Sequence, residues 1–295
     1  MDFRDLDVDC VSKTSGRQSW IVVLTGNSCC FRLMFDIVRT DVSLADWDSL
    51  IFTVHWPVTA CLMWKEGKPT HTCILPENHV WTIHGIWPNQ EGGKEGPFFC
   101  NRTWIFDPDR IETLRPQLIR VWPNIHGNDS VDSLWKHEWE KHGTCAALDP
   151  KFASEELYFN QGIQWVSYFE SFKVKNYHIT RILSQQLVVP SMSTKYNVTL
   201  IHDVLEKAIG AVPTIGCEFD KDTGNVYLSE IRLCFQRDLT LMDCKHNQKL
   251  TGLQSVTNCP TNKLIMYPGK ASFTKSSRQH RRMFHHKGKN LKNIS

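Results

Sequence analysis

The stretch from Lys136 to Cys145 holds most of the side chains that could carry out chemistry. It reads Lys-His-Glu-Trp-Glu-Lys-His-Gly-Thr-Cys, and six of its first seven residues can titrate. We expect residues 136–142 to be helical, because Gly143 is the first residue that would suit a helix end. At about 100° per residue, one side of this helix carries two imidazoles, a carboxylate and an ammonium. These groups belong to His137, Glu138, Lys141 and His142.

Two other interpretations compete with proton transfer at this stretch. A run of mixed charges on a helix is usually a solvated face with pairs four residues apart. A zinc protease is the second, because its motif opens with His-Glu and places the next His four residues after the first. Here the gap from His137 to His142 is five, and an ideal helix would separate the two by about 140°. We therefore expect no metal site and no cofactor.

A second stretch, from Trp81 to Asn89, contains an isolated histidine. Its residues alternate as in a strand that ends at Pro88, which would place His84 and Trp87 on opposite faces. His84 precedes a glycine, where the backbone of a ligand can approach closely. A lone His beside aromatic residues is more often packed in a core. His84 is therefore a catalytic candidate only in combination with the first stretch.

Taken together, the two stretches resemble the ribonuclease T2 family. Residues 81–88 are similar to its first catalytic segment and residues 137–145 to its second. The flanking His55-Trp56-Pro57 and the cysteine pattern extend the resemblance over about residues 42–268. The resemblance implies an endoribonuclease that cleaves single-stranded RNA.

The resemblance also implies a role for each catalytic side chain. His142 would be the general base that takes the proton of the RNA 2′-hydroxyl, and His84 the general acid for the leaving 5′-oxygen. His137 would contact the phosphate, while Glu138 and Lys141 would stabilise the transition state. The product would be a 2′,3′-cyclic phosphate, later hydrolysed to a 3′-phosphate. Histidine suits both proton roles, and lysine supplies positive charge where negative charge develops.

Two further residues are predicted to bind RNA. Trp87 is predicted to stack on a base, because an aromatic face tolerates any base, and core packing is its alternative. Asn89 stands where the family commonly has Asp, in the pocket for the base on the 5′ side of the cut. An uncharged amide predicts a weaker preference for adenine there. Because DNA lacks the 2′-hydroxyl nucleophile, we expect RNA and not DNA as the substrate.

The elements that position these residues indicate an α+β protein. The sequence predicts strands over 50–54, 81–88 and 226–235, the last with an exposed face, and helices over 109–122, 133–142, 154–173 and 199–210. Strands and helices do not alternate regularly, which favours a mainly antiparallel central sheet packed by several helices. A hydrophobic content of 41% in 295 residues is enough for a sizeable core.

Eight of the 11 cysteines lie in the family-like region. Spacing alone does not pair them, because eight cysteines allow many connectivities. The resemblance implies a disulfide-stapled fold with the bridges Cys61–Cys73, Cys100–Cys145, Cys217–Cys259 and Cys234–Cys244. Glycosylation sequons begin at Asn101, Asn128 and Asn197. Bridges and sequons together favour the secretory route.

The two ends of the chain differ from its middle. We expect residues 1–41 to be an unmatched N-terminal extension, 42–272 a ribonuclease T2-like catalytic domain, and 273–295 a basic, disordered tail. The chain start lacks the charge pattern of a signal peptide, and no stretch is long and apolar enough to span a membrane. We nevertheless expect a secreted or lysosomal protein that acts as a monomer.

The competing class is a catalytically silent, secreted binding or signalling protein on the same fold. The five catalytic positions are all present, which favours the enzyme. An RNA-cleavage assay separates the two classes. The net charge of +3 is too small to indicate nucleic-acid binding by itself.

Overall fold

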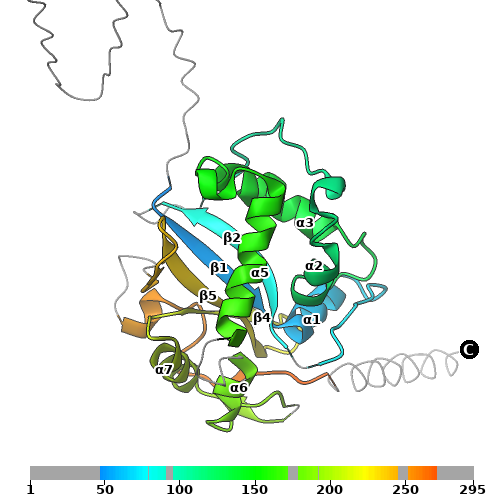
Figure 1. The fold of residues 1–295 in the computed structure, drawn as a ribbon. Coiled ribbons are helices and arrows are strands. Elements are labelled where there is room, and N and C mark those ends of the chain that lie inside the picture. Colours follow the sequence, from blue (N-terminus) through cyan, green and yellow to red (C-terminus); the bar gives the residue numbers. More distant parts are fainter. Residues whose placement is uncertain are drawn as a thin grey trace, which may run out of the picture. The chain divides into compact units, whose positions relative to one another are not determined.

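The computed structural model describes residues 47–78, 80–90, 96–171, 179–191, 193–244 and 252–270. The predicted extension and tail lie outside these residues, as does most of the loop that follows Asn89, so the domain boundaries stay predictions. The described chain has the predicted α+β class, a mainly antiparallel sheet with helices packed on it (Figure 1). No helix in this part of the chain combines the length and apolar character that a membrane crossing requires.

The strands are β1 (Ser49–His55), β2 (Thr82–Asn89), β3 (Lys195–Tyr196), β4 (Thr214–Phe219), β5 (Val226–Gln236), β6 (Leu241–Met242) and β7 (Ile265–Met266). The α-helices are α1 (Pro57–Gly67), α2 (Arg115–Val121), α3 (Ser133–Glu138), α4 (Thr144–Ala146), α5 (Glu155–Ser171), α6 (Ile179–Ser184) and α7 (Val198–Ile209). Short 3₁₀ turns are η1 (Pro108–Ile111), η3 (Pro150–Phe152) and η4 (Gly252–Ser255), and η2 (Trp139–Gly143) is a π-helical turn.

Strand β5 is the hub of the sheet. The strand path runs β2-β1-β5-β7-β3, and β4 and β6 also pair with β5. The pairs are antiparallel except for β5 with β7. Helix α5 packs on the apolar face of β5, where Trp165 stacks on Phe235 at 4.2 Å, and the predicted exposed face is limited to the partly exposed Glu230 and Arg232. Helix α1 adds a hydrogen bond from Thr59 Oγ1 to the Leu228 carbonyl, and most of β5 is buried.

A β-bulge interrupts the pairing of β1 with β2. The register shifts between Thr53 and Val54, where His84 is the extra residue of β2. A bulge bends its strand and redirects the side chains around it. The predicted placement of His84 and Trp87 on opposite faces is therefore wrong, and their ring centroids lie 5.2 Å apart.

The helix predicted over 109–122 is divided into η1 and α2. Pro116 stands in the first turn of α2. Proline has no backbone N–H and its ring clashes with the preceding turn, so it can begin a helix but not continue one. The helices predicted over 154–173 and 199–210 are confirmed as α5 and α7.

The predicted helix end at Gly143 is also wrong. The helical run continues from α3 through η2 into α4. Gly143 has helical backbone angles inside this run, and its lack of a Cβ leaves space for the Trp139 ring. Trp139 is buried, as is Trp135, so these two indoles form the packed side of this segment.

The predicted disulfides are confirmed as Cys61–Cys73, Cys100–Cys145, Cys217–Cys259 and Cys234–Cys244. The bridge from Cys100 to Cys145 links the segment before Cys100 to α4, which directly follows η2. Cross-links of this kind stabilise a fold mainly by restricting the unfolded chain.

Candidate active site

The predicted catalytic side chains come from two elements, β2 and the run from α3 into η2, which the structure places side by side. His84 Nε2 lies 3.9 Å from Glu138 Oε1. The rings of His137 and His142 have centroids 6.4 Å apart. On α5, Tyr158 donates a hydrogen bond of 2.9 Å to the Ile86 carbonyl and so fixes β2 beneath this cluster.

The π-helical turn brings the two histidines of the helix together. A π turn holds more residues than an α turn, so positions five apart lie nearly above one another. Ligand atoms of His137, Glu138 and His142 accordingly lie within 4.8 Å of one another. The predicted separation of the two imidazoles by about 140° is wrong for this reason. Such a set has the geometry to hold a divalent cation, so independence from metal stays a prediction.

His142 is held in its neutral form. Only 4% of the residue is exposed. Burial, together with the positive charges of Lys141, His137 and His84, lowers the pKa of His142 to about 2. Its Nδ1 is buried without a hydrogen-bond partner among the described residues. His142 therefore stays unprotonated in acid, which is the form that a general base requires.

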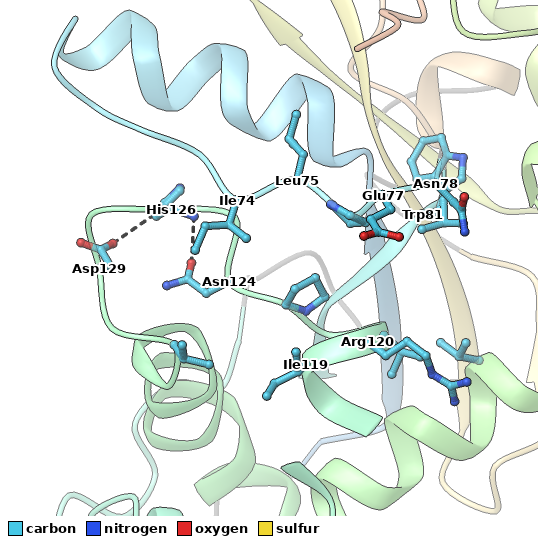
Figure 2. Close-up of a pocket in the computed structure, with 16 residues that line it drawn as sticks. Ile74, Leu75, Glu77, Asn78, Trp81, Ile119, Arg120, Asn124, His126 and Asp129 are labelled. Atoms are coloured by element: carbon cyan, nitrogen blue, oxygen red, sulfur yellow. Dashed lines mark hydrogen bonds and ion pairs between the residues drawn. The ribbon is translucent and has the colours of Figure 1, made fainter. Parts of the chain in front are cut away.

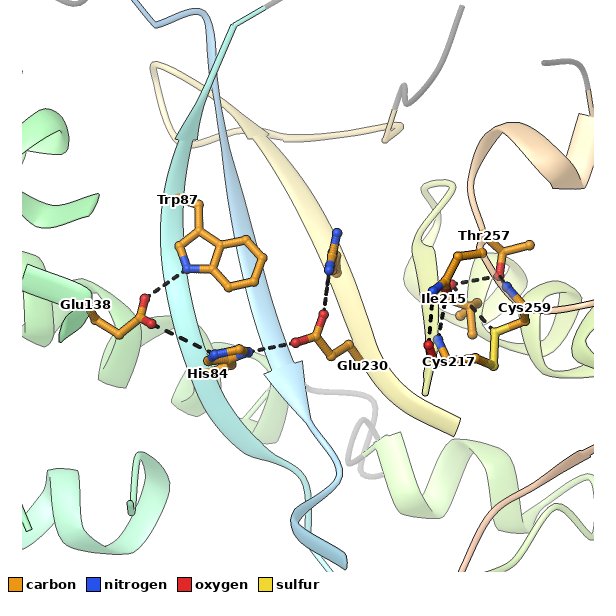
Figure 3. Close-up of polar contacts among 10 residues, drawn as sticks. His84, Trp87, Glu138, Ile215, Cys217, Glu230, Thr257 and Cys259 are labelled. Carbon is orange, nitrogen blue, oxygen red and sulfur yellow. Dashed lines mark hydrogen bonds and ion pairs between the residues drawn. A yellow bond between two sulfur atoms is a disulfide. The ribbon is translucent and has the colours of Figure 1, made fainter. Parts of the chain in front are cut away.

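His84 has the opposite environment. Its Nδ1 lies 2.7 Å from Glu230 Oε1, and its Nε2 faces Glu138 on the other side (Figure 3). Burial by itself lowers the pKa of His84, but the hydrogen bond to Glu230 and the charges of both carboxylates outweigh it, so this pKa is raised. Trp122 Nε1 donates to the His84 carbonyl at 2.9 Å and holds the backbone at the bulge. His84 can therefore keep a proton to donate.

Glu138 lies at the bottom of the site and is 1% exposed. Burial raises its pKa to about 7, against the opposing effects of His84 and of the Trp87 indole N–H. That N–H donates to Glu138 Oε2 at 2.8 Å. Gly85 makes this contact possible, because a Cβ there would overlap both the carboxylate and the indole.

Trp87 contacts several members of the cluster. Its ring lies 5.4 Å from that of His142, and the Arg232 guanidinium lies 5.2 Å above it. The ring also packs against Ile51 and the Cys234–Cys244 bridge. Trp87 thus belongs to the site and to its packing, while stacking on an RNA base stays a prediction.

The remaining predicted residues lie at the edges of the cluster. His137 is exposed. Burial of its partly covered ring, with the charge of Lys141, lowers its pKa. Lys141 Nζ lies 5.0 Å from the centre of the Phe98 ring. At the end of β2, Asn89 Nδ2 donates to Ser49 Oγ at 3.2 Å, and its contact with a base stays a prediction.

Sequence reasoning missed Glu230, Arg232 and Phe98. Glu230 and Arg232 are the two charged residues of β5, which is largely apolar, and charges within a central strand are a usable signal. Phe98 follows a Gly-Pro pair and precedes a bridged cysteine, and its ring lies 5.4 Å from that of His142. His55 was noted only as a flanking residue, yet its ring stacks on His84 at 5.2 Å.

A separate hollow lies between the segment 74–81 and the segment 119–131 (Figure 2). Its walls are apolar side chains such as Ile74 and Ile119, with Arg120 and His126 among the polar ones. None of the predicted catalytic residues lines it. We therefore assign the candidate active site from the chemistry of its side chains and not from the position of this hollow.

The sequon asparagines lie on loops and at a helix start. Asn128 and Asn197 are exposed, and Asn101 is half-buried. Asn101 Oδ1 accepts a hydrogen bond from Thr103 Oγ1 at 2.7 Å, and Asn197 caps α7. Glycosylation itself stays a prediction.

Comparison with known proteins gives one consistent result. The sequence profile of the Ribonuclease T2 family matches residues 47–244. Ribonuclease Oy of Magallana gigas is 32% identical over 225 residues, which cover 76% of this chain and 97% of that protein. Ribonuclease T2 of Sus scrofa is 35% identical over 202 residues, 68% and 90% of the two chains. The structure of ribonuclease MC1 from bitter gourd seeds superposes with a TM-score of 0.59 at 26% identity, covering 75% and 100%.

Proposed function

This chain belongs to the ribonuclease T2 family and is an RNA endonuclease of that type, and on that premise we propose a mechanism in which His142 and His84 exchange protons with the RNA. His142 takes the proton of the 2′-hydroxyl, whose oxygen attacks the phosphorus. The bond from phosphorus to the 5′-oxygen breaks, and His84 gives that oxygen its proton. The products are a 2′,3′-cyclic phosphate and a free 5′-hydroxyl. Water then opens the cyclic phosphate to a 3′-phosphate, with the two imidazoles in reversed roles.

The observation that carries this proposal is the opposite proton affinity of two imidazoles in one site. His142 is buried beside positive charge and stays neutral, as a base must. His84 donates to the ionised Glu230 carboxylate and holds its proton, as an acid must. General acid–base catalysis needs one group in each state at the same pH. His142 stays neutral and His84 stays protonated in acidic solution, which agrees with an enzyme that acts in an acidic compartment.

The remaining side chains act on the phosphate. Lys141 and His137 supply positive charge where the pentacoordinate phosphorane gathers negative charge. Glu138, with its pKa raised to about 7, keeps its proton in acid and can donate it in a hydrogen bond to a phosphate oxygen. The mechanism needs the 2′-hydroxyl, so RNA is cut and DNA is not, and it uses no metal.

Cell compartment and assembly complete the proposal. Disulfides form and persist in oxidising compartments, and the described residues contain four of them. We therefore place the protein in the secretory or endolysosomal lumen as a glycosylated monomer.

Site-directed variants test the mechanism. His84→Ala and His142→Ala should each lower RNA cleavage by about 10²–10⁴-fold, the usual contribution of an acid or base. The control His126→Ala removes a half-buried imidazole outside the site and should keep wild-type activity. Cleavage should survive EDTA, and mass spectrometry should detect the cyclic phosphate.

Three results would contradict the mechanism. Near-wild-type rates in both His84→Ala and His142→Ala would show that these residues are not the acid and the base. Loss of activity in EDTA would indicate a metal ion bound by His137, Glu138 and His142. A wild-type protein that folds but cuts no RNA would favour the silent binding protein.

A further inference from the structure

We propose that Glu230 is the positioning residue for the general acid, and that Arg232 holds Glu230 in place. The inference rests on the proposed role of His84. It assigns a function in catalysis to strand β5, which contributes none of the residues predicted from the catalytic motifs.

Each oxygen of the Glu230 carboxylate has its own partner. Oε1 lies 2.7 Å from His84 Nδ1. Oε2 accepts from Arg232, at 3.0 Å from Nε and 2.6 Å from Nη2. The Glu230 side chain is only 13% exposed, so its carboxylate has little access to competing water. A carboxylate bound at both oxygens has a fixed plane, and the imidazole that donates to it has a fixed orientation.

Arg232 is fixed in turn by the site itself. Its guanidinium lies 5.2 Å from the centre of the Trp87 ring, and the Trp87 indole donates to Glu138. The chain of contacts therefore runs from Arg232 to Glu230 and His84 on one side, and from Arg232 to Trp87 and Glu138 on the other. It closes around His84 Nε2, which faces Glu138 Oε1 at 3.9 Å. Figure 3 shows the contacts that join Glu230, His84, Glu138 and Trp87.

This arrangement selects which ring nitrogen exchanges its proton. An imidazole has two nitrogens, and the hydrogen bond at one decides the protonation of the other. Glu230 accepts from Nδ1–H both before and after transfer, so the proton that leaves is the one on Nε2. The neutral ring then keeps Nδ1–H, and Nε2 is ready to take a proton from water in the hydrolysis step.

Glu230 stays ionised under the conditions in which His84 works. Burial raises the pKa of Glu230, but the hydrogen bond and charge of His84 and the contacts with Arg232 outweigh it and lower this pKa to about 2. Other titratable or charged groups also surround His84. They are Glu138 on α3, His55 on β1, Arg232 on β5, Glu218 on β4, and His137 and His142 on the catalytic helix.

The pH dependence of RNA cleavage separates positioning from mere packing. Glu230→Gln keeps the size and an acceptor oxygen but removes the charge that favours protonated His84. The alkaline limb of kcat, where His84 loses its proton, should move down by about 1–3 pH units, the effect of a close opposite charge. The acidic limb, set by His142, should not move. Glu156→Gln is the control, because it makes the same change at an exposed carboxylate on α5 that is not among the groups around His84, and it should leave both limbs in place.

A second measurement uses the wild-type protein, so it does not depend on whether a variant folds. In wild-type protein, ¹⁵N NMR of the His84 ring should show Nδ1 protonated on both sides of its titration, with the proton lost from Nε2. Neutral His84 with its proton on Nε2, or an unmoved alkaline limb in a folded Glu230→Gln enzyme, would overturn the inference. Should His84→Ala remain fully active, the proposed mechanism itself fails, which is a different result.

Discussion

His84 and His142 are the same residue type with opposite proton affinities, and the cause is their neighbours. His142 is surrounded by aromatic rings and cationic groups, and burial dominates its pKa. His84 is also covered, but Glu230 and Glu138 flank its two nitrogens. A carboxylate within hydrogen-bond distance favours the imidazolium, and its absence leaves desolvation unopposed. In the proposed mechanism, contacts within a few ångströms thus distinguish the acid from the base.

Asn89 is the residue at which we expect base preference to change. Asn89→Asp would place a charged acceptor where the amide now donates to Ser49 Oγ. A carboxylate suits the amino group of adenine, so kcat/KM for adenine on the 5′ side of the cut should rise relative to other bases. The gain should be roughly fivefold, about 1 kcal/mol, the scale of one improved hydrogen bond.

Dinucleotide substrates that differ only in this base give the measurement. Asn225→Asp is the matched control, because it makes the same change of charge at a half-buried turn position. If wild type and Asn89→Asp rank the four bases identically, Asn89 does not contact the base.

At the scale of elements, two irregularities build the site. The bulge in β2 brings His84 and Trp87 to the same side of the sheet. The π-helical turn brings His142 beside His137, five residues before it. A regular strand and a regular helix would have dispersed these four side chains. π turns and bulges are enriched next to active sites for this reason.

Gly85 makes the bulge compatible with the catalytic helix. In Gly85→Ala the new methyl group would overlap the Glu138 carboxylate and the Trp87 indole. We expect RNA cleavage to fall by about 10²-fold or more, since small displacements of catalytic groups have effects of that size. Stability should fall by about 1–3 kcal/mol, as for other overpacked interiors.

Gly67→Ala provides the matched comparison, because nothing lies within 4 Å of a Cβ at that position. Its melting temperature and cleavage rate should equal those of wild type. A Gly85→Ala enzyme with wild-type activity would show that the space between β2 and the helix is not needed.

At the scale of the whole molecule, the site adds to the pH dependence of folding. His55 is buried at the end of β1 and stacks on His84. Burial, followed by the charge of His84, lowers its pKa to about 3. Its Nε2 has no hydrogen-bond partner among the described residues. The folded protein therefore holds a neutral imidazole that the unfolded chain would protonate in mild acid.

The sign of the effect follows from these two states. Below a pH of about 6.5 the unfolded chain binds a proton at His55 and the folded chain does not, so stability is lost as the pH falls towards 3. Between about pH 7.5 and pH 5 this loss amounts to up to about 2 kcal/mol. His55→Gln cannot be protonated, and its unfolding free energy should fall by about 1–2 kcal/mol less over that interval.

Urea unfolding at the two pH values, with the disulfides intact, gives the comparison. Each protein serves as its own reference at pH 7.5, so a general loss of stability in the variant does not affect the result. An equal decrease in both proteins would mean that His55 is protonated when folded.

The sequence alone predicted which side chains would do the chemistry and determined much of the scaffold around them. The two catalytic segments are contiguous motifs, so the identities of His84, Glu138 and His142 could be read without knowing their contacts. Helices α5 and α7 and the cores of β1, β2 and β5 followed from local periodicity, which needs only neighbouring residues. The resemblance also implied the disulfide pairs, which the structure confirms.

Tertiary structure alone decided how those side chains meet. The bulge at His84 appears only in the pairing of β2 with β1, and the helical run continues through Gly143, against which the Trp139 ring packs. Glu230 lies 146 positions from His84 along the chain, and only the pairing of β5 with β1 brings it to the imidazole. Local patterns carry no information on such contacts, because burial and hydrogen bonding between distant segments fix them only when the sheet has formed.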